Sequence, residues 1–395
     1  MNITYIIGNG FDLGLGLNTR YSDFVEFLSG RIKHWLTTNE KSWNRDEKRF
    51  AEWLEGKIVE NKNEFWHDAE EAFGGLPFSV FGEQRRDLVQ FCHGLFQSEM
   101  AEWIATKNAQ FSVPKGSEKE IGGKFVYALL YGWLKGLSED VRTEMENDVT
   151  NGSVVINILS FNYTDCIEKL LGGIDGTINE ITEIGNLKRD TRILSPIHVH
   201  GKVDTVGRSA DLVFGVDDAT QITGVETTAN DEILSRLIKE RYLGYTRKRS
   251  EREARDVLSN SNWVIVLGHS FGKTDGRWWK RIFDDLSVDQ YNIVVCPFYS
   301  NKEEVPSYIS DPIRYPRMSA ERVFQSVKDS VRDKIYEPRF MSHVYALEPI
   351  DVEAPDGTRN YCDYLNLAWF GRRCVDIGAK ELNQGQSSFE DGSNR

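Results

Sequence analysis

Four short segments of the sequence combine glycines with side chains that could do chemistry. They are Gly8 to Gly10, Phe161 to Tyr163, His198 to Gly201 and Gly268 to Ser270. Each stands at the end of a predicted strand, and three of them come directly after a run of apolar, mostly β-branched residues, which is typical of a buried strand. Ligands of open α/β sheets bind beyond the carboxyl ends of the strands, so we expect the four segments to surround one site.

The first segment, Gly8-Asn9-Gly10, stands where the opening strand should turn into a helix. Glycines at such a turn let the backbone approach a phosphate, and the N–H groups of the turn can donate to it. The spacing is not that of the dinucleotide fingerprint GxGxxG, and a tight strand-to-helix turn without a ligand would need the same glycines. Both interpretations stay open.

The next two segments supply the candidate catalytic side chains. Asn162 carries an amide that could hold sugar hydroxyls or orient a water, although an Asn here could equally cap the following helix. His198 and His200 lie two residues apart on a predicted strand and therefore on one face. Zinc would need further ligands, for which the sequence has no recognised spacing. His200, at the strand end, is the candidate general base, with His198 buried and hydrogen-bonded.

The fourth segment runs on to Gly272, and Gly-His-Ser-Phe-Gly matches the G-x-S-x-G nucleophile elbow of hydrolases. A serine hydrolase would need Ser270 as its nucleophile and a histidine later in the chain. His343 is the only later histidine, and no local feature recommends it. The match alone does not predict a serine hydrolase.

Composition narrows the class of protein. The 395 residues carry 48 Lys and Arg against 61 Asp and Glu, a net charge of -13, which argues against a general nucleic-acid binder. Basic residues gather between Lys239 and Arg255 but alternate with glutamates, as on a solvated helix face. The five cysteines form no CxxC pair, and no apolar run resembles a membrane span or a secretory signal. We therefore expect a cytoplasmic protein with free thiols.

The pattern of elements predicts an α/β fold, a doubly wound parallel sheet. Helical patterns separate most of the strand-like runs, which cover residues 3–7, 154–160, 196–201, 212–215, 263–267 and 291–295. Helical patterns also dominate a long range after the first strand, which we interpret as a helical insertion.

These patterns divide the chain into five parts. We place the first strand, glycine turn and first helix in residues 1–30, the helical insertion in 31–148, the remainder of the α/β core in 149–300, a C-terminal α/β extension in 301–381 and a flexible tail in 382–395. The tail is predicted from its near lack of apolar residues.

Taken together, the segments resemble a known family. The motif from Ile6 to Phe24, Ile-Ile-Gly-Asn-Gly-Phe-Asp-Leu-x-x-Gly-Leu-x-Thr-x-Tyr-x-Asp-Phe, and Ser-Phe-Asn-Tyr-Thr at 160–164 are similar to the bacteriophage abortive-infection AbiH family. With His-Val-His-Gly and Leu-Gly-His-Ser-Phe-x-x-x-Asp, the chain also resembles the sirtuin-like NAD-binding fold of anti-phage effectors that consume NAD. Thr164 stands where that fold has an acidic residue. The cysteine-bound zinc module of deacylating sirtuins is absent from the sequence, which argues against protein deacylation.

The resemblance implies a Rossmann-like, sirtuin-like core that hydrolyses NAD to nicotinamide and ADP-ribose. It implies that Asn162 and His200 are the catalytic pair and that NAD, as substrate, contacts a further set of residues. These are Gly8, Asn9, Gly10, Asp12, Tyr163, Gly268, His269, Ser270 and Asp275. No metal is expected. The alternative is a non-catalytic module that binds NAD or ADP-ribose and senses it or recruits a partner effector.

The same resemblance bears on partners. A constitutive NAD hydrolase would be toxic, so we expect the activity to be gated by a phage-derived trigger and by assembly into a homo-oligomer. Two strongly apolar helical patterns in the insertion offer a surface for self-association. Neither a membrane nor a nucleic acid is expected as a partner.

Overall fold

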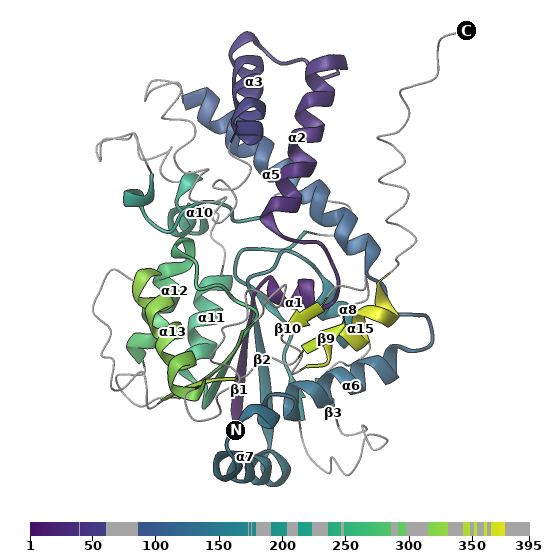
Figure 1. The fold of residues 1–395 in the computed structure, drawn as a ribbon, viewed down its shortest axis with the longest axis vertical. Helices are drawn as coiled ribbons and strands as arrows, with labels where there is room; N and C mark the ends of the chain where they lie inside the picture. The colour runs from purple at the N-terminus through teal and green to yellow at the C-terminus, as the bar shows by residue number, and fades with distance from the viewer. Residues whose placement is uncertain are drawn as a thin grey trace.

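The structure is a computed structural model whose core is a sheet covered by helices on both faces (Figure 1). It describes residues 1–38, 40–60, 86–172, 174, 176–178, 191–203, 212–222, 236–245, 249–285, 291–297, 315–330, 343–347, 351–353, 359–361 and 365–375. The tail predicted for residues 382–395 lies outside these ranges.

Six of the described strands run parallel in the order β4-β2-β1-β6-β7-β8. Their bounds are β1 Asn2–Ile7, β2 Val154–Ser160, β4 Thr191–Ile193, β6 Trp263–Leu267, β7 Asn292–Cys296 and β8 Val344–Ala346. An antiparallel strand, β3 (Gly176–Ile178), adds to the β4 edge, and the short β5 (Ile197–His198) pairs with the end of β2. This is the doubly wound order, with the chain switching direction at β1, so the predicted α/β fold is confirmed.

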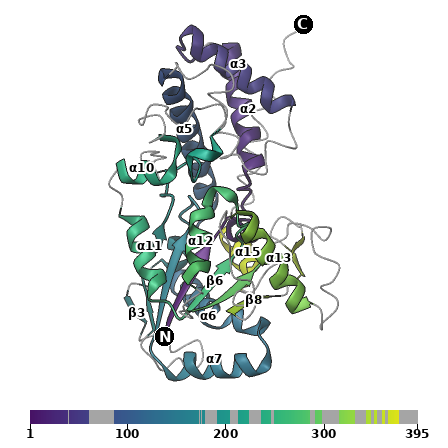
Figure 2. The same cartoon turned by 90° about the vertical axis from the view of Figure 1, so that its left-hand side faces the viewer.

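Strand residues alternate between two hydrophobic cores because side chains along a strand point to opposite faces. Tyr5 of β1 packs with one layer of helices and Ile6 with the other. The first layer consists of α6 (Glu118–Tyr131), α7 (Glu139–Asn151), α8 (Cys166–Leu171) and α15 (Leu367–Cys374). The second consists of α11 (Ser250–Ser259), α12 (Gly276–Asp285) and α13 (Tyr315–Ser330), with α11 and α12 in front of the strands in Figure 2.

A third group of helices extends beyond the carboxyl ends of the strands (Figures 1 and 2). We call α2 (Tyr21–Thr38), α3 (Arg45–Glu60) and α5 (Arg86–Gln110) the helical layer. A separate core joins them to Val203, to residues 212–222 and to Leu237 and Ile238, which precede α10 (Lys239–Tyr245). The range 31–148 thus contributes to two cores, because α6 and α7 pack on the sheet. No helix in the described parts of the chain is long and apolar enough to cross a membrane.

Shorter elements complete the described chain. They are α1 (Gly10–Gly14), three 3-10 turns, η1 (Trp133–Gly136), η2 (Ala219–Gln221) and η3 (Lys273–Asp275), and a hairpin of β9 (Asp351–Glu353) and β10 (Arg359–Tyr361). The strand expected over residues 212–215 is wrong. Phe214 is buried in the core of the helical layer and Val213 donates its N–H to the backbone oxygen of His200, so these residues are apolar without belonging to a strand.

Candidate functional site

The carboxyl ends of four strands lie side by side. Ile7 of β1 is paired with Ser160 of β2 and with Leu267 of β6, and Ser160 is paired with His198 of β5. The four polar segments therefore meet at one edge of the sheet, as the sequence predicts. The helical layer stands above this edge (Figure 1).

The glycines of the first and fourth segments let two turns pack against each other. Gly8 N–H donates to the Leu267 oxygen (3.0 Å) and Gly10 N–H to the Gly268 oxygen (2.8 Å). A Cβ on Gly8 would lie 2.8 Å from the Gly268 oxygen, and one on Gly268, whose φ is +60°, would lie 2.7 Å from Gly10 Cα. Close packing explains these glycines, and the two amides donate to backbone oxygens of the protein. Contact of this turn with NAD stays a prediction.

A pocket of about 60 Å³ lies where the ends of β1 and β2 meet the helical layer. We call it the Asp12 pocket; it is lined by Asn9, Asp12, Thr19, Tyr21, Met100, Trp103, Ile104, Phe161, Asn162 and Tyr163. Four of these residues belong to the predicted site. The others come from the stretch that leads into α2, from α2 and α5, and from the end of β2, so one pocket combines polar strand ends with aromatic and aliphatic side chains.

Asp12 is the buried acid of this pocket, with 2% of its surface exposed. Its Oδ2 accepts a hydrogen bond from the Thr164 hydroxyl (2.8 Å), whereas its Oδ1 has no hydrogen-bond partner among the described residues. Burial raises the pKa of Asp12 from 3.8 to about 7, although hydrogen bonds from Thr164 and Asn162 oppose the rise. Thr164, which departs from the sirtuin-like pattern, is therefore a hydrogen-bond donor to the pocket's acid.

Asn162 is buried at the end of β2 and connects two strand ends. Its Nδ2 donates to the Gly8 oxygen (3.1 Å), so its amide does not cap α8, for which Asp165 is the N-cap residue. Its backbone oxygen accepts a hydrogen bond from His198 Nδ1 (3.0 Å). His198 Nε2 lies 2.9 Å from Glu168 Oε1, so the prediction that His198 is hydrogen-bonded and largely buried is confirmed.

His200 belongs to a second group of buried side chains, which we call the Asp275 cluster. His200 Nε2 lies 3.1 Å from Asp275 Oδ1, and Lys239 Nζ lies 3.0 Å from the same oxygen. His269 Nε2 lies 3.9 Å from Asp275 Oδ2. All four side chains are almost fully buried, so the cluster holds several titratable groups away from solvent.

The charges of the Asp275 cluster follow from burial and from its ion pairs. Burial raises the pKa of Asp275, but Lys239 and His200 together outweigh it and leave that pKa well below its usual range. Burial lowers the pKa of His269 to about 4 and, with Lys239, lowers the pKa of His200 against the opposing effect of Asp275. At neutral pH an ionised carboxylate thus faces neutral imidazoles. Its contact with His200 Nε2 favours a proton there and leaves Nδ1 as the basic nitrogen.

Lys239 was missed as a site residue, because the sequence places it on a solvated basic face. That interpretation is wrong for Lys239, whose side chain is 1% exposed and also donates to the Thr274 oxygen (3.2 Å). It holds for Arg241 and Arg252, which are exposed. The two apolar residues before Lys239, Leu237 and Ile238, are the signal that could have revealed its burial.

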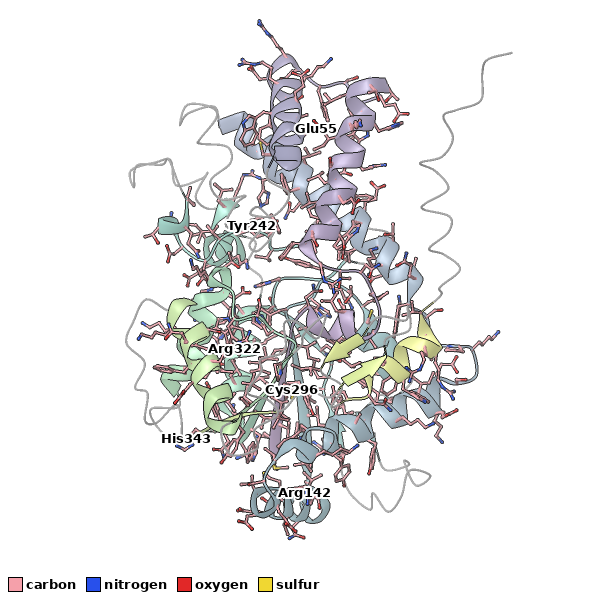
Figure 3. The ribbon with its side chains drawn as sticks, viewed as in Figure 1. Glu55, Arg142, Tyr242, Cys296, Arg322 and His343 are labelled. Atoms are coloured by element: carbon pink, nitrogen blue, oxygen red, sulfur yellow. The ribbon has the colours of Figure 1, made fainter. Side chains whose placement is uncertain are left out.

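Ser270 lies outside both groups. It is exposed, and the residue with the positive φ (57°) is Phe271, so the turn differs from a nucleophile elbow, where the nucleophile itself is strained. His343 contacts Asn292 at the amino end of β7, whereas Cys296 marks the carboxyl end (Figure 3). A serine triad of Ser270 and His343 is therefore excluded by position. Among the described residues, no group of three or more His, Cys, Asp or Glu could hold a metal ion.

Phe161 separates the Asp12 pocket from the Asp275 cluster. It lines the pocket, and its ring makes edge contacts with the rings of His200 (5.1 Å) and His269 (5.0 Å). Tyr163 also spans the two groups, since it lines the pocket and its ring centre lies 6.3 Å from that of His200. The structure thus gathers the predicted residues into two neighbouring groups, with Asn162 in one and His200 in the other.

These features define an α/β protein with a doubly wound sheet, whose buried acids and histidines gather at the carboxyl edge under a helical layer. The model of the family described as Bacteriophage abortive infection AbiH matches residues 4–296. The chain belongs to this family, which implies a role in abortive infection by bacteriophages. None of the curated proteins matches the chain.

Proposed function

We propose that the protein acts in abortive infection by hydrolysing NAD to nicotinamide and ADP-ribose at the carboxyl edge of its sheet. The observation that carries the proposal is the burial of Asn162 and His200 at adjacent strand ends, on either side of Phe161. The edge at which a doubly wound sheet reverses its strand order is where such folds bind nucleotides. The resemblance of the four segments to NAD-consuming effectors supports NAD as the substrate in this proposal.

Cleavage of the nicotinamide–ribose bond passes through a ribose with oxocarbenium character, and nicotinamide leaves as a neutral molecule. In this proposal Asn162 positions the ribose, and its hydrogen bond to the Gly8 oxygen holds the amide in place. His200 accepts the proton of a ribose hydroxyl through Nδ1 as the bond to nicotinamide breaks and returns it to the same oxygen once water has added, so that ADP-ribose leaves with its hydroxyl intact. A base must be neutral to act, which is the state that burial favours for His200.

The NAD contacts predicted from the sequence are part of the same proposal. The Asp12 pocket is far smaller than NAD, so binding requires side chains of α5, among them Met100 and Trp103, to withdraw from the edge of the sheet. Such a movement gives a phage-derived trigger or self-association a way to control the activity.

Nicotinamide release from NAD by the purified protein, with and without lysate of phage-infected cells, tests the proposal. We expect His200→Ala to lower the rate by about 10²- to 10⁴-fold while NAD affinity changes little, because a general base acts in the transition state. His93→Ala is the matched control, since His93 is a buried histidine of α5 outside the site. Rates are compared at temperatures equally far below each variant's unfolding midpoint. Equal rates for wild type and His200→Ala would remove His200 from the mechanism.

The alternative is a module that binds NAD or ADP-ribose without cleaving it. One observation favours it: Asn162 and His200 both have partners within the protein, Gly8 and Asp275, as purely structural residues would. Calorimetric titration with NAD and with ADP-ribose distinguishes the two. Tight binding by a wild-type protein that releases no nicotinamide under any trigger would establish the binding module.

A further inference from the structure

The carboxyl group of Asp12 is a buried group of the site to which the chemistry above assigns a predicted contact with NAD and no step of the reaction. Its Oδ2 is taken by Thr164, but within the described residues no donor reaches its Oδ1. Asp12 is almost fully buried and lines the pocket. A buried carboxyl oxygen without a donor costs free energy, so this oxygen calls for a partner inside the pocket.

The size and lining of the Asp12 pocket indicate which partner fits. About 60 Å³ corresponds to roughly one or two water molecules, each of which occupies about 30 Å³ in the liquid. Asn9 and Thr19, which hydrogen-bond each other (2.7 Å), and Asn162 add polar atoms to the lining. Trp103 of α5, which is itself buried, is also part of the lining. A small polar molecule with two to four hydrogen bonds suits this setting.

We propose that Asp12 holds the attacking water in this pocket and is its general base. The inference rests on the proposed NAD hydrolysis and assigns that reaction a second base. The carboxylate takes one proton from the water while the water oxygen bonds to the anomeric carbon of the ribose. The bond from that carbon to the nicotinamide nitrogen breaks, and its electron pair stays on the nitrogen, so that the products are ADP-ribose and nicotinamide, with the proton on Asp12. Asp12 later releases this proton to solvent and is again a carboxylate that can act as a base.

The surroundings of Asp12 suit this task. The groups that face it are the hydrogen-bond donors Thr164 and Asn162, the charged or titratable His198, Asp165 and Cys166, and the pocket tyrosines Tyr21 and Tyr163. Burial is the largest influence and sets a pKa of about 7, which suits a base that works near neutral pH. His200 lies beyond Phe161 and is held to Asp275, so the two bases serve different protons, one from the ribose hydroxyl and one from the water.

Asp12→Asn tests the proposal because it keeps the size of the side chain and removes its basicity. We expect kcat for nicotinamide release to fall by about 10²- to 10⁴-fold with little change in KM. In the wild type the rate falls below about pH 7 as Asp12 takes up a proton, and we expect Asp12→Asn to lack this acid limb. Azide attacks without losing a proton, so added azide should partly restore cleavage in Asp12→Ala, yielding azido-ADP-ribose.

Asp165→Asn is the matched control. It removes a neighbouring carboxylate that is paired with Lys169 (2.8 Å) and is not part of the pocket lining. It should keep the rate near neutral pH and keep an acid limb, which moves slightly to lower pH because the charge of Asp165 is a minor cause of the raised pKa of Asp12. Thermal unfolding at pH 8 checks folding, and we expect Asp12→Asn to be no less stable than wild type. An Asp12→Asn protein that keeps the wild-type rate and acid limb would overturn the inference and leave NAD hydrolysis intact. A wild-type protein that releases no nicotinamide would overturn both.

Discussion

Two buried aspartates lie on either side of Phe161, and their surroundings act on them in opposite ways. Asp275 lies 3.0 Å from Lys239 and 3.1 Å from His200, and these two neighbours keep its pKa well below its usual range. Asp12 accepts a hydrogen bond from the Thr164 hydroxyl and has no ion pair among the described residues, and its pKa rises to about 7. Burial opposes ionisation at both positions, so the neighbouring cation decides the outcome. A fully paired carboxylate serves as a fixed support, whereas the less paired one keeps the capacity to exchange a proton.

Removing the charge of Asp275 should have the largest effect on stability. Asp275→Asn leaves Lys239 buried without a counter-charge, so we expect the free energy of unfolding to fall by about 3–5 kcal/mol. Urea denaturation at pH 7 measures it. Asp275→Asn combined with Lys239→Met should recover part of the loss, because no charge is then left unpaired. A single variant as stable as wild type would mean that the pair does not stabilise the fold.

Asp12→Asn should act on stability in the opposite direction. Below pH 3.8 Asp12 is protonated in both the folded and unfolded states. As the pH rises toward 7, the unfolded chain loses this proton while the folded protein retains it, so wild type becomes less stable. Relative to wild type, Asp12→Asn should gain stability from pH 4 to 7, approaching about 4 kcal/mol at 1.36 kcal/mol per pH unit, and level off above. Denaturation of both proteins at pH 4.5, 6 and 8 measures the difference in their free energies of unfolding. A difference that does not change with pH would contradict the raised pKa of Asp12.

The turn at Gly8 to Gly10 packs closely against the turn at Gly268 to Ser270, and Gly8→Ala tests how much this contact stabilises the fold. The added Cβ would meet the Gly268 oxygen at 2.8 Å and His269 Cα at 2.9 Å, so the strand ends must move apart. We expect a loss of about 1–3 kcal/mol, as for other overpacked sites, measured by thermal denaturation. Gly30→Ala is the control: a Cβ there meets nothing within 4 Å on helix α2, and we expect a gain of about 0.5–1 kcal/mol.

Replacing His269 of the Asp275 cluster should have the smallest effect on stability among these variants. Its pKa is about 4 in the folded protein and near 6.5 in the unfolded chain, so protons bind the unfolded chain first as the pH falls, and wild type loses stability below pH 6.5. His269→Gln should reduce the loss between pH 7 and pH 5 by about 1–2 kcal/mol. Paired denaturation curves at these two pH values measure it. An unchanged loss would show that other groups cause the acid sensitivity.

The convergence of the four segments was predictable because strand signals are local. The run Val154 to Ser160 is β-branched and apolar, and a parallel sheet places the carboxyl ends of such runs along one edge. The same reasoning failed for residues 212–215. Apolarity reports burial, and it does not report whether the buried backbone pairs with a strand or fills the core of a helical layer.

The division of the site into two groups could not be predicted, because it depends on contacts between distant residues. The burial of Lys239 depends on Asp275, which follows it by a full helix and a strand. The pKa of Asp12 is raised by burial, to which side chains of α5 contribute, and the rise is limited by the hydrogen bond from Thr164, which lies beyond the helical range in the sequence. Residue types alone indicated that these side chains could do chemistry, but the balance of burial and pairing that decides their charge is tertiary.

The central position of β1 has a consequence for the time at which the site forms during synthesis. Asn2 pairs with Val155 of β2, and Ile3 pairs with Trp263 of β6. The first strand can therefore complete its pairing only after both neighbouring strands have been synthesised. At about 5–20 residues per second, a ribosome takes roughly 15–50 seconds to pass from β1 to β6. Asp12 emerges early and Asp275 late, so a nascent chain that stops before β6 has Lys239 and His200 without the carboxylate that they contact in the folded protein.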